Sequence, residues 1–244
     1  MKVLINYANS KYESSQKLNS KTGLETGGFD EVISYSPKDL DKEFFEQNKK
    51  ILSQKKGNGY WLWKPYFIKK TLERLNSEDF LFYCDAGAYF VDSIDPLIKL
   101  SLEYKQDIIP FELIKDESAW TKRDAFILMD CNKASYVNTR QRLSGYNLWR
   151  KSSFTMDFLS EFLEYAKDER IITDIDNQCG QPNYPDFKEH RQDQSIFSLL
   201  TKKYGLKSFR DPSQWGIDEK KNYPSSKYEQ LIVSTRRRGF FLVL

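Results

Sequence analysis

The sequence predicts an α/β protein in which helices flank a mostly parallel sheet. Short apolar runs, typical of buried strands, alternate along the chain with longer segments of helical periodicity. Residues 80–84 form a continuous apolar and aromatic run, which is typical of a strand buried on both faces of such a sheet. No repeat and no Pro-, Gly- and Ser-rich linker divides the chain, so we expect one domain over residues 1–244.

The first half of the chain should contribute two strands and two helices before that central strand. The strands are expected at residues 2–7 and 30–36, which have apolar centres. A long helix should follow, because Ser36 suits its N-cap and Pro37 its first turn, and Gly57 would end it. A second helix is expected over residues 64–79, where apolar residues recur on one face.

The second half of the chain should continue the alternation of strands and helices. A helix is expected at residues 93–106, followed by a strand at 107–113. Two amphipathic helices should then span residues 152–168 and 193–205. We expect Asp193 to be the N-cap of the last helix and Gly205 to end it.

Composition excludes several classes of function. The 38 Lys and Arg residues nearly balance the 35 Asp and Glu residues, giving a net charge of +3, so a general nucleic-acid binder is disfavoured. His190 is the one histidine, which excludes sites built from two or three imidazoles. The three cysteines are widely spaced, which favours reduced thiols in a cytosolic protein.

The two ends of the chain bear on localisation. The N-terminal apolar run is three residues long, so we expect no signal peptide, and no stretch approaches the length needed to span a bilayer. At the other end, three arginines (residues 236–238) precede the apolar residues 240–244. This segment is either a last buried strand with basic flanks or a contact with anionic lipid headgroups or a substrate phosphate.

The residues that follow the predicted strands are the first candidates for a site, since ligands of open α/β sheets bind beyond the carboxyl ends of the strands. Asn6 and Tyr7 end the first strand, and Asp85, Ala86 and Gly87 follow the central one. A carboxylate followed by small residues suits a metal-bound diphosphate, in which Mg²⁺ or Mn²⁺ neutralises the leaving phosphate. Alternatively, Asp85 only caps the next turn.

Other nucleotide signatures are absent or weak. There is neither a GxGxxG nor a GxxxxGK[ST] pattern, so a Rossmann dinucleotide site and a P-loop are disfavoured. Two DxD triplets occur, at residues 39–41 and 174–176. The first lies in an expected helical first turn, where acids suit the helix dipole, and we interpret both mainly as structural.

Two polar and aromatic clusters remain. In residues 59–66, Lys64 is surrounded by aromatic side chains and either points at a phosphate or belongs to a core-forming helix entrance. In residues 189–195, Asp193 and Gln194 either face a ligand or cap a helix, with His190 then in solvent. A Ser-His-Asp triad within this second cluster is disfavoured, because its members are too close in sequence and no GxSxG elbow is present.

Taken in order, GYWLWKPY, a strand ending in DAG, and HRQDQS resemble the GT-A glycosyltransferases of bacterial capsule and lipopolysaccharide clusters. The resemblance spans roughly residues 60–203 and implies a GT-A-like, Rossmann-like sheet. It implies that Asp85 binds a metal and the donor diphosphate, although the second acid of the usual DxD is missing. It also implies that Asp193 and Gln194 face the donor sugar or acceptor, and that His190 is the one histidine available to a metal.

The resemblance also implies an activity. The chain would move a sugar from a nucleotide-sugar donor, with a UDP-sugar favoured, to a capsular polysaccharide, lipopolysaccharide or lipid-linked glycan. Mn²⁺ or Mg²⁺ would assist. Asn6 and Tyr7 would lie near the nucleotide, Lys64 or Arg123 would offset phosphate charge, and the segment with Tyr146 and Trp149 would shape the acceptor pocket.

Two alternatives stay open at this point. One is a non-catalytic carbohydrate-binding or assembly subunit, and the other is transfer of another phosphorylated group to capsule sugars. We expect a cytoplasmic protein without nucleic-acid partners, with peripheral contact at the inner membrane face through its basic C-terminus.

Overall fold

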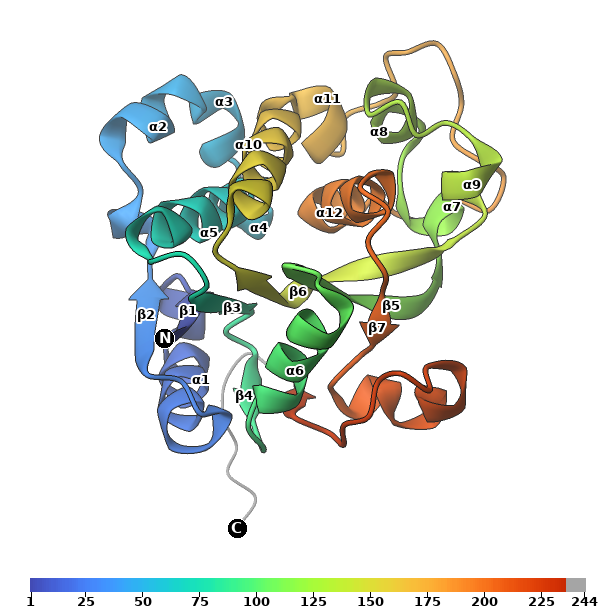
Figure 1. Ribbon diagram of the computed structural model, residues 1–244. Coiled ribbons are helices and arrows are strands. Elements are labelled where there is room, and N and C mark those ends of the chain that lie inside the picture. Colours follow the sequence, from blue (N-terminus) through green and yellow to red (C-terminus); the bar gives the residue numbers. More distant parts are fainter. Residues whose placement is uncertain (236–244) are drawn as a thin grey trace.

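A six-stranded sheet with helices on both faces forms the centre of the molecule (Figure 1). The computed structural model describes residues 1–235 of the chain. The sheet has the order β2-β1-β3-β6-β5-β7, and β4 and β8 form a separate two-stranded sheet. The strands are β1 (Lys2–Tyr7), β2 (Glu31–Tyr35), β3 (Phe80–Cys84), β4 (Ala88–Phe90), β5 (Ile108–Asp116), β6 (Arg140–Arg150), β7 (Phe209–Arg210) and β8 (Ile232–Ser234).

The sheet is mostly parallel, as the sequence predicts. Strands β2, β1 and β3 are mutually parallel neighbours, and β5 pairs with β7 in the same sense. Strand β6 alone runs antiparallel, pairing with β3 on one side and β5 on the other. This eleven-residue strand is central to the sheet and was not among the expected strands.

Most helices lie in the positions that the apolar periodicity predicts. The longer α-helices are α1 (Glu13–Thr22), α5 (Trp63–Arg74), α6 (Asp95–Tyr104), α10 (Ser153–Lys167) and α12 (Gln192–Lys203). The shorter ones are α2 (Lys42–Gln47), α3 (Lys49–Leu52), α4 (Gly57–Tyr60), α7 (Glu117–Trp120), α8 (Arg123–Leu128), α9 (Ala134–Val137) and α11 (Glu169–Ile172). Four further short helical turns are η1 (Ser10–Tyr12), η2 (Gly23–Gly27), η3 (Pro37–Asp39) and η4 (Gln214–Asn222).

The single long helix expected to end at Gly57 is wrong. Ser36 does cap a helical turn, with a capping box that includes Asp39, but this turn is η3 and the chain leaves it in extended conformation at Leu40. Helices α2 and α3 follow as separate short elements, with Asn48 between them in non-helical conformation. The chain then turns through left-handed conformations at Asn58, Tyr60 and Trp61, which redirect it into α5.

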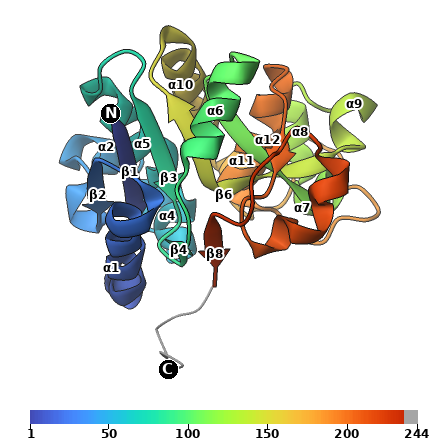
Figure 2. The ribbon, with the colours of Figure 1, turned by 60° about the horizontal axis from the view of Figure 1, so that its bottom comes forward.

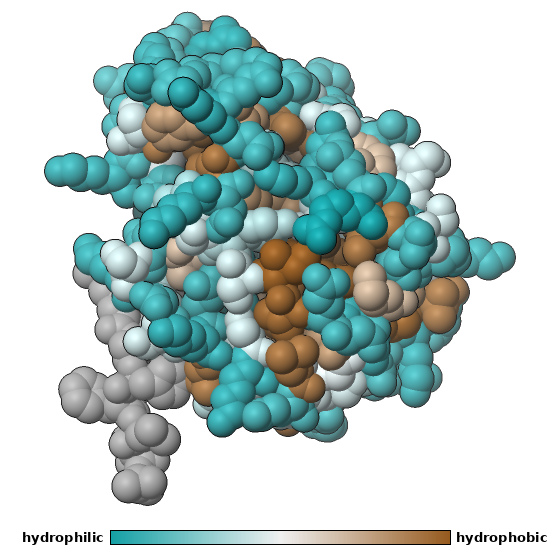
Figure 3. All heavy atoms as spheres, turned by 90° about the vertical axis from the view of Figure 1, so that its left-hand side faces the viewer, coloured by the Kyte–Doolittle hydropathy of each residue, from teal (hydrophilic) through white to brown (hydrophobic). Residues whose placement is uncertain are grey.

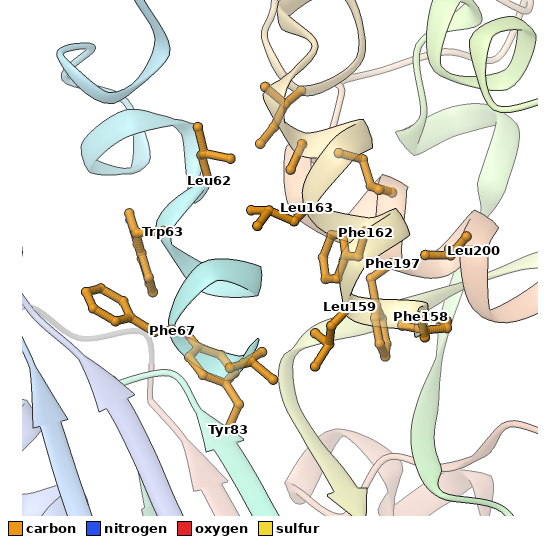
Figure 4. Packing of buried hydrophobic residues seen from close by; sticks show 14 of the residues in the cluster. Leu62, Trp63, Phe67, Tyr83, Phe158, Leu159, Phe162, Leu163, Phe197 and Leu200 are labelled. Atoms are coloured by element: carbon orange, nitrogen blue, oxygen red, sulfur yellow. The ribbon is translucent and has the colours of Figure 1, made fainter. Parts of the chain in front are cut away.

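One face of the sheet carries the larger core. Helices α5, α10 and α12 pack side by side on it, and their aromatic and aliphatic side chains interdigitate (Figure 4). Trp149 of β6 is fully buried there between Phe158 and Phe197. This packing fixes the beginnings of α5 and α12 relative to the strand ends.

The opposite face holds a second core under α6 and the β4–β8 pair. Phe29, Phe82 and Phe90 contact one another there, and Ile232 of β8 is buried in the same cluster. Figure 2 shows α6 and β8 on this side of the molecule, with α1 and α9 at its opposite ends. The loop that leaves β3 meets the residue after β8, since the backbone N–H of Thr235 donates to the carbonyl of Gly87 at 3.1 Å.

The surface is mixed in character. Figure 3 shows hydrophilic residues over much of the side at which β2 ends the sheet, with hydrophobic residues gathered near its centre. In the described part of the chain, no helix is both long enough and apolar enough to cross a bilayer. The three cysteines are free thiols, and the basic and apolar segment of residues 236–244 lies outside the described residues.

Candidate active site

A cavity of about 930 Å³ opens at the carboxyl ends of β1 and β3, the edge at which the sequence placed a ligand. Its first side is lined by Tyr7, Ala8, Asn9, Lys11, Tyr12, Trp61 and residues 55–58. Its centre consists of Trp63, Lys64 and residues 85–87, 143–146 and 191–194. Its other side is lined by residues 112–115, Asp211, Trp215, Gly216, Glu219, Tyr223 and Ser234.

The strand order separates these three parts in space. Tyr7 ends β1, and Asp85 follows β3, the next strand in the sheet. Ser144 lies on β6, and Glu112 lies on β5 beyond it. The carboxylate of Asp85 and the Ser144 segment therefore stand between a side built on β1 and a side built on β5 and the segment after β7.

Lys64 is the buried cation at the centre of the cavity wall. It lies in the first turn of α5, and its side chain is 3% exposed. Its Nζ is 2.7 Å from Oδ2 of Asp193 and 3.6 Å from Oδ1 of Asp85. It also donates to the backbone oxygen of Ser144 at 3.2 Å and lies over the Tyr83 ring.

Asp193 reaches this cation from α12. We expected Asp193 to be the N-cap, but Arg191 holds that position and makes no side-chain cap. Asp193 lies two residues after Arg191, in the first turn of the helix, where the helix dipole favours an acid. Its carboxylate pairs with Lys64 and accepts a 2.6 Å hydrogen bond from Oγ of Ser144, so it is held from two directions.

Asp85 is the accessible acid of the group. Its side chain is 48% exposed, and its Oδ1 accepts a 2.5 Å hydrogen bond from the Tyr83 hydroxyl. Its backbone N–H donates to the carbonyl of Gly145 at 2.7 Å. A Cβ on Gly145 would lie 3.1 Å from Oδ2 of Asp85, so glycine leaves room for this carboxylate.

Burial and pairing shift the ionisation of these groups. Burial alone would lower the pKa of Lys64, but Asp193 and Asp85 outweigh it and raise that pKa above its usual range. Burial raises the pKa of Asp193, and Lys64 and Ser144 oppose that rise. The site thus combines a firmly charged ammonium with one buried and one accessible carboxylate.

The remaining central candidates also line the cavity. Gln194 donates to Gln141 at 2.7 Å, and its Oε1 accepts from the backbone N–H of Ser144 at 3.4 Å. The Tyr146 hydroxyl donates to the buried carboxylate of Asp211 at 2.7 Å. Ala86 and Gly87 lie directly beside Asp85 in the cavity wall.

The side built on β1 contains aromatic and basic residues. Tyr7 stacks on Trp63 with ring centroids 3.7 Å apart, and its hydroxyl accepts from the side-chain amide of Asn58. Burial raises the pKa of Tyr7 to about 12, so its hydroxyl stays protonated. Asn6 points away from the cavity, since its side chain bonds Asn19 and Gln16 inside the protein.

Three predicted site residues besides Asn6 lie away from this cavity in the structure. Trp149 is buried in the core, where its Nε1 donates to Asn147 at 2.5 Å. Arg123 begins α8, and its guanidinium lies over the ring of Tyr184. His190 lines a second cavity of about 490 Å³, which also includes the acids of residues 174–176.

A shared metal site for Asp85 and His190 was expected, and the structure does not bring these residues together. Both ring nitrogens of His190 are engaged, with the backbone N–H of Lys122 at 3.2 Å and the carbonyl of Ile171 at 2.7 Å. Across residues 1–235, no group of three or more His, Cys, Asp or Glu side chains is arranged to hold a metal ion. The accessible carboxylate of Asp85 still fits an ion that takes its other ligands from a bound diphosphate and water.

Several cavity residues could not be singled out from local sequence patterns. Ser144 and Gly145 lie on β6, whose polar composition hides the strand. Asp211, Trp215, Glu219 and Tyr223 come from the segment after β7, which lacks a local motif.

Comparisons with known proteins agree with this architecture at the level of fold. No protein-family model matches the chain, and no curated protein matches it in sequence. Among solved structures, mouse xyloside xylosyltransferase 1 matches with a TM-score of 0.52 and 10% identity, over 99% of this chain and 100% of that one. The fold is that of solved glycosyltransferases. The bifunctional glycosyltransferase WbbM matches with a TM-score of 0.57 and 7% identity, over 96% of this chain and 45% of that one.

Proposed function

We propose that this protein is a glycosyltransferase that moves a sugar from a nucleotide-sugar donor, with a UDP-sugar favoured, to a glycan acceptor. The observation that carries the proposal is the arrangement of Lys64 between Asp193 and Asp85 at the wall of a large cavity at the sheet edge. The fold shared with solved glycosyltransferases supports it.

The donor's nucleotide is assigned to the side built on β1. Tyr7, Tyr12 and Trp61 offer ring surface for a base or ribose, and Lys11 and Lys55 offer positive charge for phosphates. A divalent cation, Mn²⁺ or Mg²⁺, held by Asp85 and the donor's diphosphate oxygens, would supply charge neutralisation of the leaving phosphate. The accessibility of the Asp85 carboxylate supports this role.

The donor sugar is assigned to the centre of the cavity. Asp193 and Gln194 begin α12 at this point and line the cavity, so they are the residues we assign to the sugar. Lys64 holds the Asp193 carboxylate in place through a 2.7 Å contact and opposes the rise in its pKa that burial causes. Pre-positioned polar groups of this kind favour one orientation of the reacting sugar.

The most specific part of the proposal concerns the class of acceptor. A capsular polysaccharide, lipopolysaccharide or lipid-linked glycan is the acceptor implied by the sequence resemblance. Peripheral attachment to the inner membrane face, through the basic residues 236–238, would bring the enzyme to a lipid-linked acceptor.

A donor screen tests the proposal. The purified protein is incubated with a panel of UDP-, GDP- and CMP-sugars, with and without Mn²⁺, and the released nucleotide is measured alongside thermal stabilisation. We expect binding and release with at least one donor, and strong loss of release in Asp85→Asn and Asp193→Asn. Asp130→Asn is the matched control, because Asp130 is 82% exposed and lies outside the cavity.

Two outcomes would contradict the proposal. One is failure of every sugar nucleotide to bind or be hydrolysed, and the other is full turnover in both site variants. Stabilisation by oligosaccharides alone would favour a carbohydrate-binding subunit instead.

A further inference from the structure

An exposed tryptophan lies at the rim of the cavity, on the side away from the nucleotide. Trp215 is 59% exposed, whereas Trp63 and Trp149 are buried in the core. Ile114 of β5 lines the same side of the cavity and is 61% exposed. Large apolar side chains left in water beside a cavity favour a ligand that covers them.

The backbone that carries Trp215 is firmly held. Oγ of Ser213 accepts from the backbone N–H of Trp215 at 3.3 Å, which caps η4. A Cβ on Gly216 would lie 2.0 Å from the carbonyl oxygen of Asp211, so the two segments approach as closely as glycine allows. Gln214 also exchanges two hydrogen bonds with the backbone of Ser234 on β8. Trp215 is thus presented on a pre-ordered turn, which lowers the entropic cost of binding.

Carboxylates surround this apolar rim. Glu112 accepts hydrogen bonds from Tyr223 at 2.5 Å and from Ser208 at 2.7 Å, and Glu219 pairs with Arg140 at 3.0 Å. Glu112, Glu219 and Tyr223 all line the cavity. A flat ring surface beside fixed carboxylates and a hydroxyl matches a sugar, which has apolar C–H faces and hydroxyls around its edge.

The charged residues on the two sides of the cavity indicate which ligand binds at this surface. The side built on β1 contains three lysines, at positions 11, 55 and 56. The side near Trp215 contains three carboxylates, those of Glu112, Glu219 and Asp211, and one lysine, Lys115, so acids predominate there. Phosphates are repelled by such acids, and a neutral glycan is not. The ligand on this side should therefore be uncharged and rich in hydroxyl groups.

We infer that Trp215, together with Ile114 and the carboxylates of Glu112 and Glu219, forms the binding surface for a neutral pyranose unit of the acceptor glycan. The indole packs on the apolar face of this sugar, in the same cavity as Asp193 and Gln194, to which the donor sugar is assigned. This inference rests on the proposed function, and it goes beyond it by naming the surface and the chemistry of the acceptor.

The test uses the full chain labelled with 5-fluorotryptophan and followed by ¹⁹F NMR. The Trp215 signal is assigned as the one that disappears in Trp215→Phe. Methyl glycosides of glucose, galactose and N-acetylglucosamine, and the disaccharides cellobiose and lactose, are titrated to high millimolar concentration in the presence of UDP and Mn²⁺. We expect at least one to shift the Trp215 signal in a saturable way.

Variants separate this surface from the donor side. Trp215→Ala should weaken binding of that sugar about tenfold or more, as truncation of a central aromatic contact does, while UDP affinity stays within about twofold. Ile217→Ala is the matched control, because Ile217 is exposed on the same turn but does not line the cavity. It should leave both affinities unchanged.

The inference is overturned if no sugar shifts the Trp215 signal, or if UDP alone shifts it and sugars add nothing. The proposed function fails separately, through the absence of donor binding and nucleotide release. A saturable Trp215 shift with sugars but no donor binding would keep the surface and remove the transferase.

Discussion

Lys64 and Asp193 form a buried ion pair that joins the first turn of α5 to the first turn of α12. Nζ of Lys64 lies 2.7 Å from Oδ2 of Asp193, and both side chains are less than one-tenth exposed. Ser144 of β6 bonds both partners, so three separate elements meet at this contact. The pair therefore bears on stability as well as on the proposed chemistry.

Removing the cation alone should be costly. Lys64→Met leaves the buried carboxylate of Asp193 without its charge partner, and we expect the free energy of unfolding to fall by about 3 kcal/mol. Urea unfolding at neutral pH measures this loss. Replacing both partners, as in Lys64→Met with Asp193→Leu, should restore part of it, since neither variant side chain is charged.

The double-variant cycle decides whether the pair itself matters. If the effects of Lys64→Met and Asp193→Leu simply add, the two charges do not stabilise each other in the folded protein. Nucleotide release should be lost in all three variants, because the proposed function uses the Asp193 carboxylate and Lys64 holds that carboxylate in position.

Asp85→Asn should separate activity from stability. The side chain is half-exposed and has room, so the thermal midpoint should stay close to that of the unchanged protein. Nucleotide release should fall roughly a hundredfold, and Mn²⁺ should no longer increase thermal stabilisation by UDP. A variant that keeps its Mn²⁺ response would show that Asp85 does not hold the ion.

Apolar runs and helical periodicity correctly predicted the strands and helices that show these patterns in their own residues. Strand β3 occupies the expected residues 80–84, and α10 spans Ser153–Lys167, within one residue of the expected helix at each end. Strand β6 was missed because its buried face includes Gln141, Ser144 and Asn147. Gln141 bonds Glu117 and Ser144 bonds Asp193, both distant in sequence, so these buried positions are polar and no apolar run marks the strand.

The same distinction between local patterns and contacts between distant residues applies to the candidate site. Asp85 could be singled out because it directly follows a recognisable strand, and Lys64 and Asp193 because they lie in dense motifs. Their pairing is a tertiary contact between α5 and α12, which no spacing in the sequence encodes. Asp193 was mistaken for a cap for the same reason, since its partner Lys64 lies on another helix.

Gly145→Ala should disturb Asp85 without unfolding the protein. The added Cβ would lie 3.1 Å from Oδ2 of Asp85, so that carboxylate must move by a few tenths of an ångström. Displacement of a reacting group by such an amount should lower nucleotide release about tenfold. In an Asp85→Ala background the same glycine substitution should have almost no further effect, and a full additional loss there would place its action elsewhere.

His190 should make folding stability depend on pH in a distinctive window. Burial, with a smaller contribution from the charge of Lys122, lowers the pKa of His190 from 6.5 to about 3. The unfolded chain therefore binds a proton between these values and the folded chain does not. The stabilisation is complete above pH 6.5 and is lost as pH falls below that value, levelling off near pH 3.

Comparison with a His190 variant separates the contribution of this histidine from that of the acidic groups that titrate in the same pH range. Between pH 7 and pH 5, the free energy of unfolding should fall by about 2 kcal/mol more for the unchanged protein than for His190→Gln. Urea unfolding at both pH values measures the two differences. Glutamine is expected to lower stability at pH 7, because it replaces bonds to Lys122 and Ile171, so the pH-dependent difference is the quantity compared. Parallel pH profiles of the two proteins would show that His190 is protonated in the folded state, which would contradict its burial between two backbone partners.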